Sequence, residues 1–138
     1  MIPTAMAPVP KVRSRFAKWV FLIAAIYGFI IILPDYFLEH AITPPINHVI
    51  YYYGFVSLAL AWQVAFLIIS FDTRRYRIMM LPAVIDKAGF ALPAWLLYIH
   101  GSGDRAVLPF ASIDLIFGIL FLIAFALVRS PAPAPKAR

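Results

Sequence analysis

Two ionisable residues, Asp86 and Lys87, are adjacent in the middle of a long apolar stretch of the sequence. Asp114 interrupts the last apolar stretch, and Gln63 and Tyr27 are polar residues inside two others. A carboxylate in such surroundings can exchange a proton or hold the polar group of a ligand, and a neighbouring lysine can neutralise it. The same residues can instead form an ion pair that fixes the register of packed helices. The sequence leaves both interpretations open.

A second set of polar residues lies where apolar stretches end. Its members are Asp35, Glu39, His40, Asn47, His48 and His100. Three histidines and two acids could bind a metal, but their spacing matches no ligand signature, and polar residues are expected where a helix meets water. We therefore predict an outer rim that holds no metal and no cofactor, in which Asn47 and His48 cap a helix.

Tyr51, Tyr52 and Tyr53 are consecutive and follow this rim, while Trp95 and Tyr98 are expected at a similar level. Tyr and Trp commonly form a belt at the membrane–water interface. We favour that interpretation for these rings. The alternative is an aromatic-lined mouth for an apolar ligand, beside which Pro93 lets its helix splay.

The composition shows what kind of element must position these residues. Of the 138 residues 64% are hydrophobic and 13% are charged, and the mean hydropathy is +0.89. Soluble domains have about 45 to 50% apolar residues, so the sequence predicts an integral membrane protein. The absence of cysteine excludes disulfides and thiolate metal sites. The net charge is +6, but the basic residues flank apolar runs. They do not form a patch beside aromatic side chains that could contact bases, which argues against nucleic acid as a partner.

We predict an all-α fold, a four-helix antiparallel bundle of membrane-spanning helices forming a single domain over residues 16–129. The predicted spans cover about residues 17–38, 47–71, 78–100 and 107–128. Residues 1–15 and 130–138 are rich in proline and are expected to be disordered tails.

A depth estimate places the polar residues in one layer. With a rise of about 1.5 Å per residue, Asp86 lies about 12 Å from the inner edge of a hydrocarbon layer about 30 Å thick. Gln63 and Tyr27 come to the same depth, whereas Asp114 falls about two turns nearer the outer face. A charge there costs about 2.5 to 3.5 kcal/mol, so these side chains should face one another. Because adjacent residues diverge by about 100°, one of Asp86 and Lys87 should meet Asp114 or Gln63.

The positive residues predict the orientation. Ten of the twelve flank the ends of the spans on one side, and only Arg105 lies in a connection on the other. Positive flanks are retained in the cytoplasm, so both termini should be cytoplasmic. The basic connection around Arg75 could also touch anionic headgroups, but a topology signal explains it sufficiently.

Several segments between Tyr27 and Phe125 share a pattern with other sequences: LPDYFLE, PPINHVIYYYGF, LAWQVAFLI, FDTRRYR, DKAGFALP and IDLIFGILF. In this pattern the chain resembles a group of small uncharacterised bacterial proteins with four predicted spans. That resemblance implies a multi-pass protein of the bacterial inner (plasma) membrane and brings no activity, ligand or partner. Asp86, followed by Phe90, Leu92 and Pro93, more distantly resembles the four-span sterol-isomerase and sigma-2-receptor superfamily, which implies an intramembrane isomerase as an alternative.

The sequence thus predicts a lipid-embedded protein that binds a lipophilic small molecule or a partner protein through its polar layer, with Asp86 and Lys87 as the centre. An isomerase-like or quinone-related enzyme that uses Asp86 and Asp114 as acid and base is an alternative. An accessory subunit of a larger membrane complex is another. Each predicted span contains a glycine, which permits close helix packing, but no GxxxG pair marks a face for a homo-oligomer.

Overall fold

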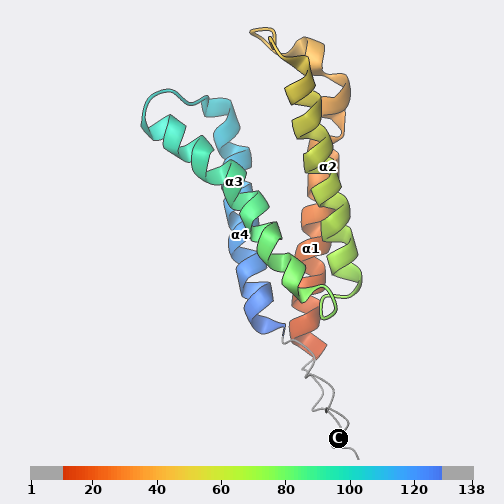
Figure 1. Cartoon of the computed structure of the whole chain (residues 1–138). Helices are drawn as coiled ribbons and strands as arrows, with labels where there is room; N and C mark the ends of the chain where they lie inside the picture. The colour runs from red at the N-terminus through yellow and green to blue at the C-terminus, as the bar shows by residue number, and fades with distance from the viewer. Residues whose placement is uncertain (1–10, 129–138) are drawn as a thin grey trace, which may run out of the picture.

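The computed structural model describes residues 11–128, and the parts of the predicted tails beyond them lie outside the described residues. Four α-helices dominate the chain (Figure 1). They are α1 (Lys11–Ile32), α2 (Val49–Phe71), α3 (Met80–Ile99) and α4 (Leu108–Leu127). Short 3-10 turns in the connections are η1 (Pro34–Phe37), η2 (Glu39–Ala41), η3 (Arg77–Met79) and η4 (Arg105–Val107). The described residues contain no strand, so the all-α bundle is confirmed.

The ends of the helices follow from local sequence, with one difference from expectation. Residues 11–15, which we assigned to the N-terminal tail, belong to α1. Lysine and arginine are good helix formers, and no proline follows Pro10 in this segment, so nothing stops the helix there. In α3, Pro82 falls in the first turn, where a missing N–H costs nothing, and Pro93 alone is interior.

All four helices, taken with their flanking 3-10 turns, are 23 to 27 residues long and apolar enough to cross a membrane. Their outward faces carry large apolar side chains, among them Ile50, Ile85 and Ile99, each at least 70% exposed. Water would penalise so much exposed apolar surface, whereas lipid chains accept it. The outward faces therefore suit a lipid environment.

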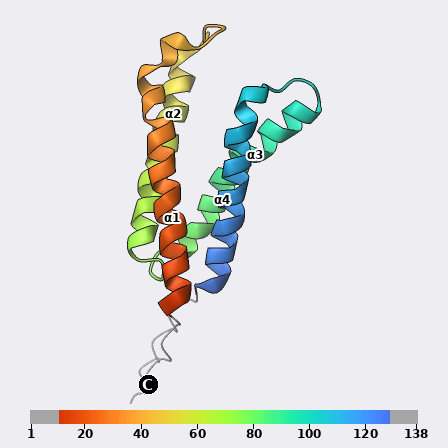
Figure 2. The same ribbon diagram turned by 180° about the vertical axis from the view of Figure 1, so that it is seen from behind.

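The four helices form two hairpins, α1 with α2 and α3 with α4, joined mainly where α1 packs on α4. We call the base the end that holds the starts of α1 and α3, and the tip the opposite end. Figures 1 and 2 show that α2 and α3 lie close at the base and separate toward the tip. We call the widening space between α2 and α3 the wedge.

The base is closed by aromatic packing. Phe21, Phe66 and Phe121 come from α1, α2 and α4 and are fully buried. The ring centroids of Phe21 and Phe121 lie 4.1 Å apart, and that of Phe66 lies 5.1 Å from Phe121 and 6.0 Å from Phe21. We call these three rings the aromatic floor. Because each ring belongs to a different helix, the floor ties both hairpins together.

Arg77 adds a second tie at the base. Its Nε donates to the backbone carbonyl of Phe125 at 3.1 Å and to that of Val128. Its guanidinium carbon lies 3.7 Å from the centre of the Phe125 ring. The last carbonyls of a helix lack intrahelical donors and carry partial negative charge, so an arginine is a fitting partner. This contact holds the start of α3 against the end of α4.

The side-chain hydrogen bonds of the tip stay within each hairpin, and the ring pair of Phe55 and Phe90, with centroids 6.5 Å apart, crosses from α2 to α3. On the first, the hydroxyls of Tyr36 and Ser57 are 2.9 Å apart, and the Tyr52 hydroxyl donates to the Asp35 carbonyl at 2.7 Å. On the second, Gly101 follows the C-cap of α3, and its φ of 78° lets the Ser102 amide donate to the Leu97 carbonyl. This turn reverses the chain directly into η4.

Candidate functional site

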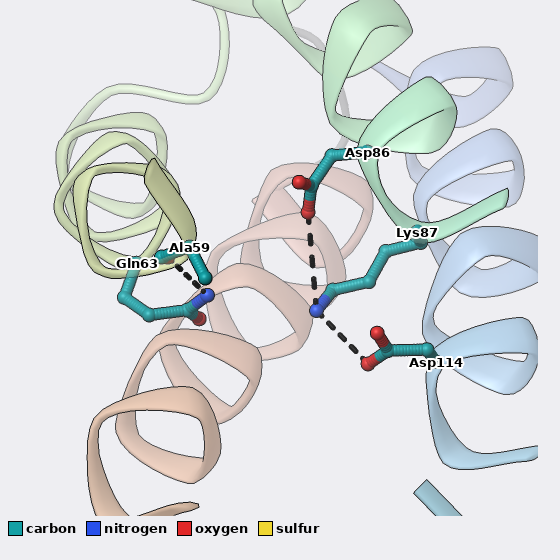
Figure 3. Close-up of polar contacts among 5 residues, drawn as sticks. All are labelled: Ala59, Gln63, Asp86, Lys87 and Asp114. Carbon is teal, nitrogen blue, oxygen red and sulfur yellow. Dashed lines mark hydrogen bonds and ion pairs between the residues drawn. The ribbon is translucent and has the colours of Figure 1, made fainter. Parts of the chain in front are cut away.

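Lys87 is the centre of the polar layer (Figure 3). It is 4% exposed, and its Nζ donates to Asp114 Oδ1 at 2.9 Å. The nearest oxygen of Asp86 lies 4.0 Å from the same Nζ. Lys87 therefore makes its hydrogen bond to Asp114 on α4 and only a longer ion pair to its own neighbour.

The contact between α3 and α4 gives the height of Asp114 relative to Lys87. A Cβ built on Gly118 would lie 3.5 Å from Lys87 Cβ, so the Lys87 backbone is level with Gly118. Asp114 lies one helical turn from Gly118, about 6 Å nearer the tip, and the lysine side chain spans that turn. Asp86 precedes Lys87 by one residue in α3, so Asp114 lies about 7.5 Å, or about one and a half turns, nearer the tip than Asp86.

Asp86 faces the wedge. Figure 3 shows its carboxylate in the space between α2 and α3, pointing toward Lys87. Its side chain is 22% exposed, against 5% for Lys87 and 16% for Asp114. It accepts no hydrogen bond from any residue in the described part of the chain. When both acids are ionised, two carboxylates and one ammonium leave the cluster with one negative charge.

Gln63 enters the layer from α2. It is 1% exposed, and its Nε2 donates to the Ala59 carbonyl at 2.9 Å. Its Oε1 is buried and has no partner among the described residues. This oxygen lies against α1, because a Cβ built on Gly28 would come within 1.9 Å of it. Gly28 thus lets α1 and α2 approach at the level of the site.

Tyr27 completes the layer from α1. Its ring packs on Phe117 of α4 with centroids 5.7 Å apart. Its hydroxyl is buried, and within residues 11–128 nothing hydrogen bonds to it. Two buried oxygens, on Gln63 and Tyr27, therefore stand beside the Lys87 cluster without partners. Such groups are costly in a low dielectric, so two of them beside one ion pair make the layer an unusual part of the bundle.

The aromatic floor lies directly under this layer, a relation that the sequence analysis missed. Lys87 Nζ is 5.3 Å from the centre of the Phe66 ring, within reach of a cation–π contact. Phe66 follows Gln63 by three residues, which places both side chains on one face of α2. That spacing is the signal that could have revealed the contact.

The outer rim does not assemble as one cluster. Asp35, Glu39 and His48 belong to the tip of the first hairpin, whereas His100 ends α3 on the second. Figure 1 shows these two tips apart. His100 Nδ1 lies 2.7 Å from the carbonyl of Leu96 within its own helix. No group of three or more His, Cys, Asp or Glu residues in the described range could hold a metal.

His48 is the N-cap residue of α2, as predicted, but its side chain makes no capping hydrogen bond. Its ring packs on Tyr51 instead, with centroids 5.8 Å apart. Tyr51 is 74% exposed, while Tyr53 packs on Tyr36 at 5.4 Å. The tyrosines of the tip are thus divided between the outer surface and contacts within the hairpin.

An apolar depression on the surface is separate from the polar layer. It is open to the outside and is lined by Phe29, Ile30, Leu33, Pro34 and Phe37. None of the polar side chains of the layer borders it. The candidate site is therefore the cluster of Gln63, Asp86, Lys87 and Asp114, with Tyr27 beside it.

Comparison of the chain with protein families, with curated proteins and with solved structures finds no match.

Proposed function

We propose that this chain is a multi-pass protein of a bacterial inner membrane that binds a lipophilic small molecule at the polar layer. The ligand lies in the wedge, with its polar group beside Asp86 and its apolar part against the side chains of α2 and α3. The exposed apolar faces of the four helices support the membrane location. The base faces the cytoplasm, as the positive residues predict.

One observation carries the ligand proposal. The Asp86 carboxylate has no hydrogen bond within the described chain although it sits in the middle of an apolar helix, and the cation beside it is bonded to Asp114. An ionisable group at this depth is expensive unless a polar partner satisfies it. The unpartnered oxygens of Gln63 and Tyr27 add to this demand. A ligand that supplies a hydrogen-bond donor would satisfy Asp86, whose side chain is the accessible one of the three.

The test is mass spectrometry of lipophilic molecules that co-purify in mild detergent. Wild type and Asp86→Asn are compared, with Glu39→Gln as a matched control that removes a carboxylate from the tip. We expect one compound enriched in wild type and in Glu39→Gln, and at least tenfold less of it with Asp86→Asn. Equal retention by Asp86→Asn would place the ligand elsewhere, and a co-purifying protein in place of a small molecule would favour the accessory-subunit alternative.

The orientation is tested separately by reporter fusions. A phosphatase fused after Ser102 should be active in the periplasm, and one fused after Arg138 should be inactive there. The opposite pattern would reverse the assignment of base and tip to the two sides of the membrane.

A further inference from the structure

The base of the bundle is its packed end, and the start of α1 belongs to it. On α1 all members of the buried core cluster precede Tyr27, and on α2 they follow Gln63. On α3 they precede Lys87, and on α4 they follow Asp114. Because the helices alternate in direction, the whole cluster lies on the base side of the polar layer. Its first member on α1, Ala17, fixes which face of the helix start is turned toward the core and which is turned outward.

The base also carries most of the positive side chains of the described residues. Only Asp72 among the six acidic residues of the chain lies at this end, and its carboxylate accepts a hydrogen bond from the Arg75 amide. Arg77 bonds to the end of α4. The other cations at the base form no ion pair within residues 11–128, and they are Lys11, Arg13, Arg15, Lys18, Arg74 and Arg75. The base therefore presents positive charge that the acidic side chains of the protein do not neutralise.

One face of α1 connects part of this charge to the lipid-facing surface. Large apolar side chains that are each at least half exposed follow one another at intervals of three or four residues: Trp19, Ile23, Ile26 and Ile30. Such intervals keep side chains on one face of a helix. Arg15 precedes Trp19 by four residues and continues this face toward the base, with Lys11 and Lys18 four and three residues from Arg15. All three cations are exposed. We call these apolar and cationic side chains the outer stripe of α1.

The outer stripe has the length and the polarity of one phospholipid. The distance along the helix from Lys18 to Ile30 is about 18 Å, and one leaflet of hydrocarbon is about 15 Å thick. A topology signal accounts for the number of cations at the base but does not require them on the lipid-facing side. We propose that the outer stripe binds an anionic phospholipid, whose phosphate contacts Arg15 and Lys18 and whose acyl chains lie along Trp19 to Ile30.

The charge of the stripe selects the headgroup. A zwitterionic lipid offers the same phosphate, but Arg15 and Lys18 repel its positive group, and no acid lies on α1 to hold that group. An anionic lipid brings a phosphate whose charge is not compensated, and an arginine guanidinium can bind phosphate with two parallel hydrogen bonds. This site is separate from the polar layer, so the inference goes beyond the proposed function and needs no ligand beside Asp86.

Trp19 can report which lipid lies beside the stripe, because it is exposed and follows Lys18 directly. Trp62→Phe and Trp95→Phe make it the single tryptophan of the chain, which has three. The full chain is reconstituted in vesicles with fixed proportions of phosphatidylglycerol and phosphatidylcholine, in which either the one lipid or the other is brominated. Bromine quenches tryptophan fluorescence only at close range, so the two quenching curves give an exchange constant for the lipids next to Trp19.

We expect the exchange constant to favour phosphatidylglycerol by about fivefold, because each cation near an anionic surface contributes about that factor and salt screens part of the attraction. Arg15→Gln with Lys18→Gln should abolish the preference. Arg13→Gln is the matched control, because Arg13 is an exposed cation two residues from Arg15 and therefore about 200° away around the helix. It should leave the constant unchanged. Quenching by brominated phosphatidylcholine checks that Trp19 still faces lipid in each variant.

Equal quenching by the two lipids in the Trp19 reporter would overturn the site. Loss of the preference with Arg13→Gln would overturn it as well, since the attraction would then belong to all cations of the base. A second reporter keeps Trp95 near the tip and carries Trp19→Phe and Trp62→Phe. It should show no preference, and a preference equal to that of Trp19 would also refute the site. Asp86→Asn should not change the constant at Trp19, so failure of this inference and failure of the ligand proposal are distinguishable.

Discussion

The base and the tip of the bundle are made from the same four helices and are similarly apolar, yet only the base is packed into a core. At the base, rings from three helices interdigitate over alanines such as Ala17, Ala24 and Ala124. Small residues let backbones approach, and the rings then fill the remaining space. At the tip, large side chains point outward and the hairpins separate. Hydropathy therefore decides that a helix spans a membrane, and residue size decides where helices touch.

The polar layer lies at the boundary between these two halves, and its ion pair should give the largest effect. Lys87→Leu leaves Asp114 as an uncompensated charge against the core, which should cost about 3 to 5 kcal/mol of unfolding free energy. Adding Asp114→Leu should restore most of that loss, because the carboxylate that remains, Asp86, has the most exposed side chain of the three, at 22%. Reversible unfolding in mixed micelles measures both.

The same variants test which carboxylate is the partner of Lys87. The sequence analysis left open whether Lys87 pairs with Asp86 or with Asp114, and for a pair with Asp86 the rescuing change would be Asp86→Leu. The 2.9 Å bond to Asp114 predicts that Lys87→Leu with Asp86→Leu stays destabilised. Rescue by Asp86→Leu and not by Asp114→Leu would mean that the register of α3 on α4 differs from the one described here.

Truncation of matched rings compares the two halves directly. Phe121 is fully buried in the aromatic floor, and Phe55 is 56% exposed in the wedge. Phe121→Ala should cost about 3 kcal/mol through the cavity that it leaves. Phe55→Ala should cost well under half of that. Equal losses in an unfolding titration would show that the tip closes into a core of its own.

Some features of the fold and of the polar layer could be predicted from the sequence, and others could not. The spans could be predicted because about twenty predominantly apolar residues admit few structures in lipid. The polar layer was readable from depth. The sequence could not show which acid binds Lys87. That choice depends on the height of α3 relative to α4, which the close approach at Gly118 sets. The separation of His48 from His100 was also hidden, since it arises from how two hairpins pack and not from either sequence segment.

Glycine substitutions test the contact between α1 and α2 at the boundary. Gly28→Ala should cost about 1 to 3 kcal/mol, because the added methyl group would overlap the Gln63 amide at 1.9 Å. Gln63→Ala should relieve the clash in the double variant. Gly54→Ala is the control on the tip half of α2, where a Cβ meets nothing within 4 Å and helix propensity alone should change. If Gly28→Ala were as harmless as Gly54→Ala, the packing of Gln63 against α1 would be wrong.

The smallest expected effect concerns the contact of Arg77 with the end of α4. Arg77→Lys keeps the charge but loses the planar group that bonds the Phe125 carbonyl and covers its ring. We expect a loss of about 1 kcal/mol, concentrated at the end of α4, because its last carbonyls then lack this donor. Hydrogen exchange should rise at residues 125–128 and stay unchanged at the tip. Arg75→Lys is the matched control, since Arg75 is exposed and its guanidinium carbon lies 5.7 Å from the centre of the Tyr76 ring. A rise at the tip as large as that at the base would mean that the two halves open together, and the independence of the wedge from the packed half would be lost.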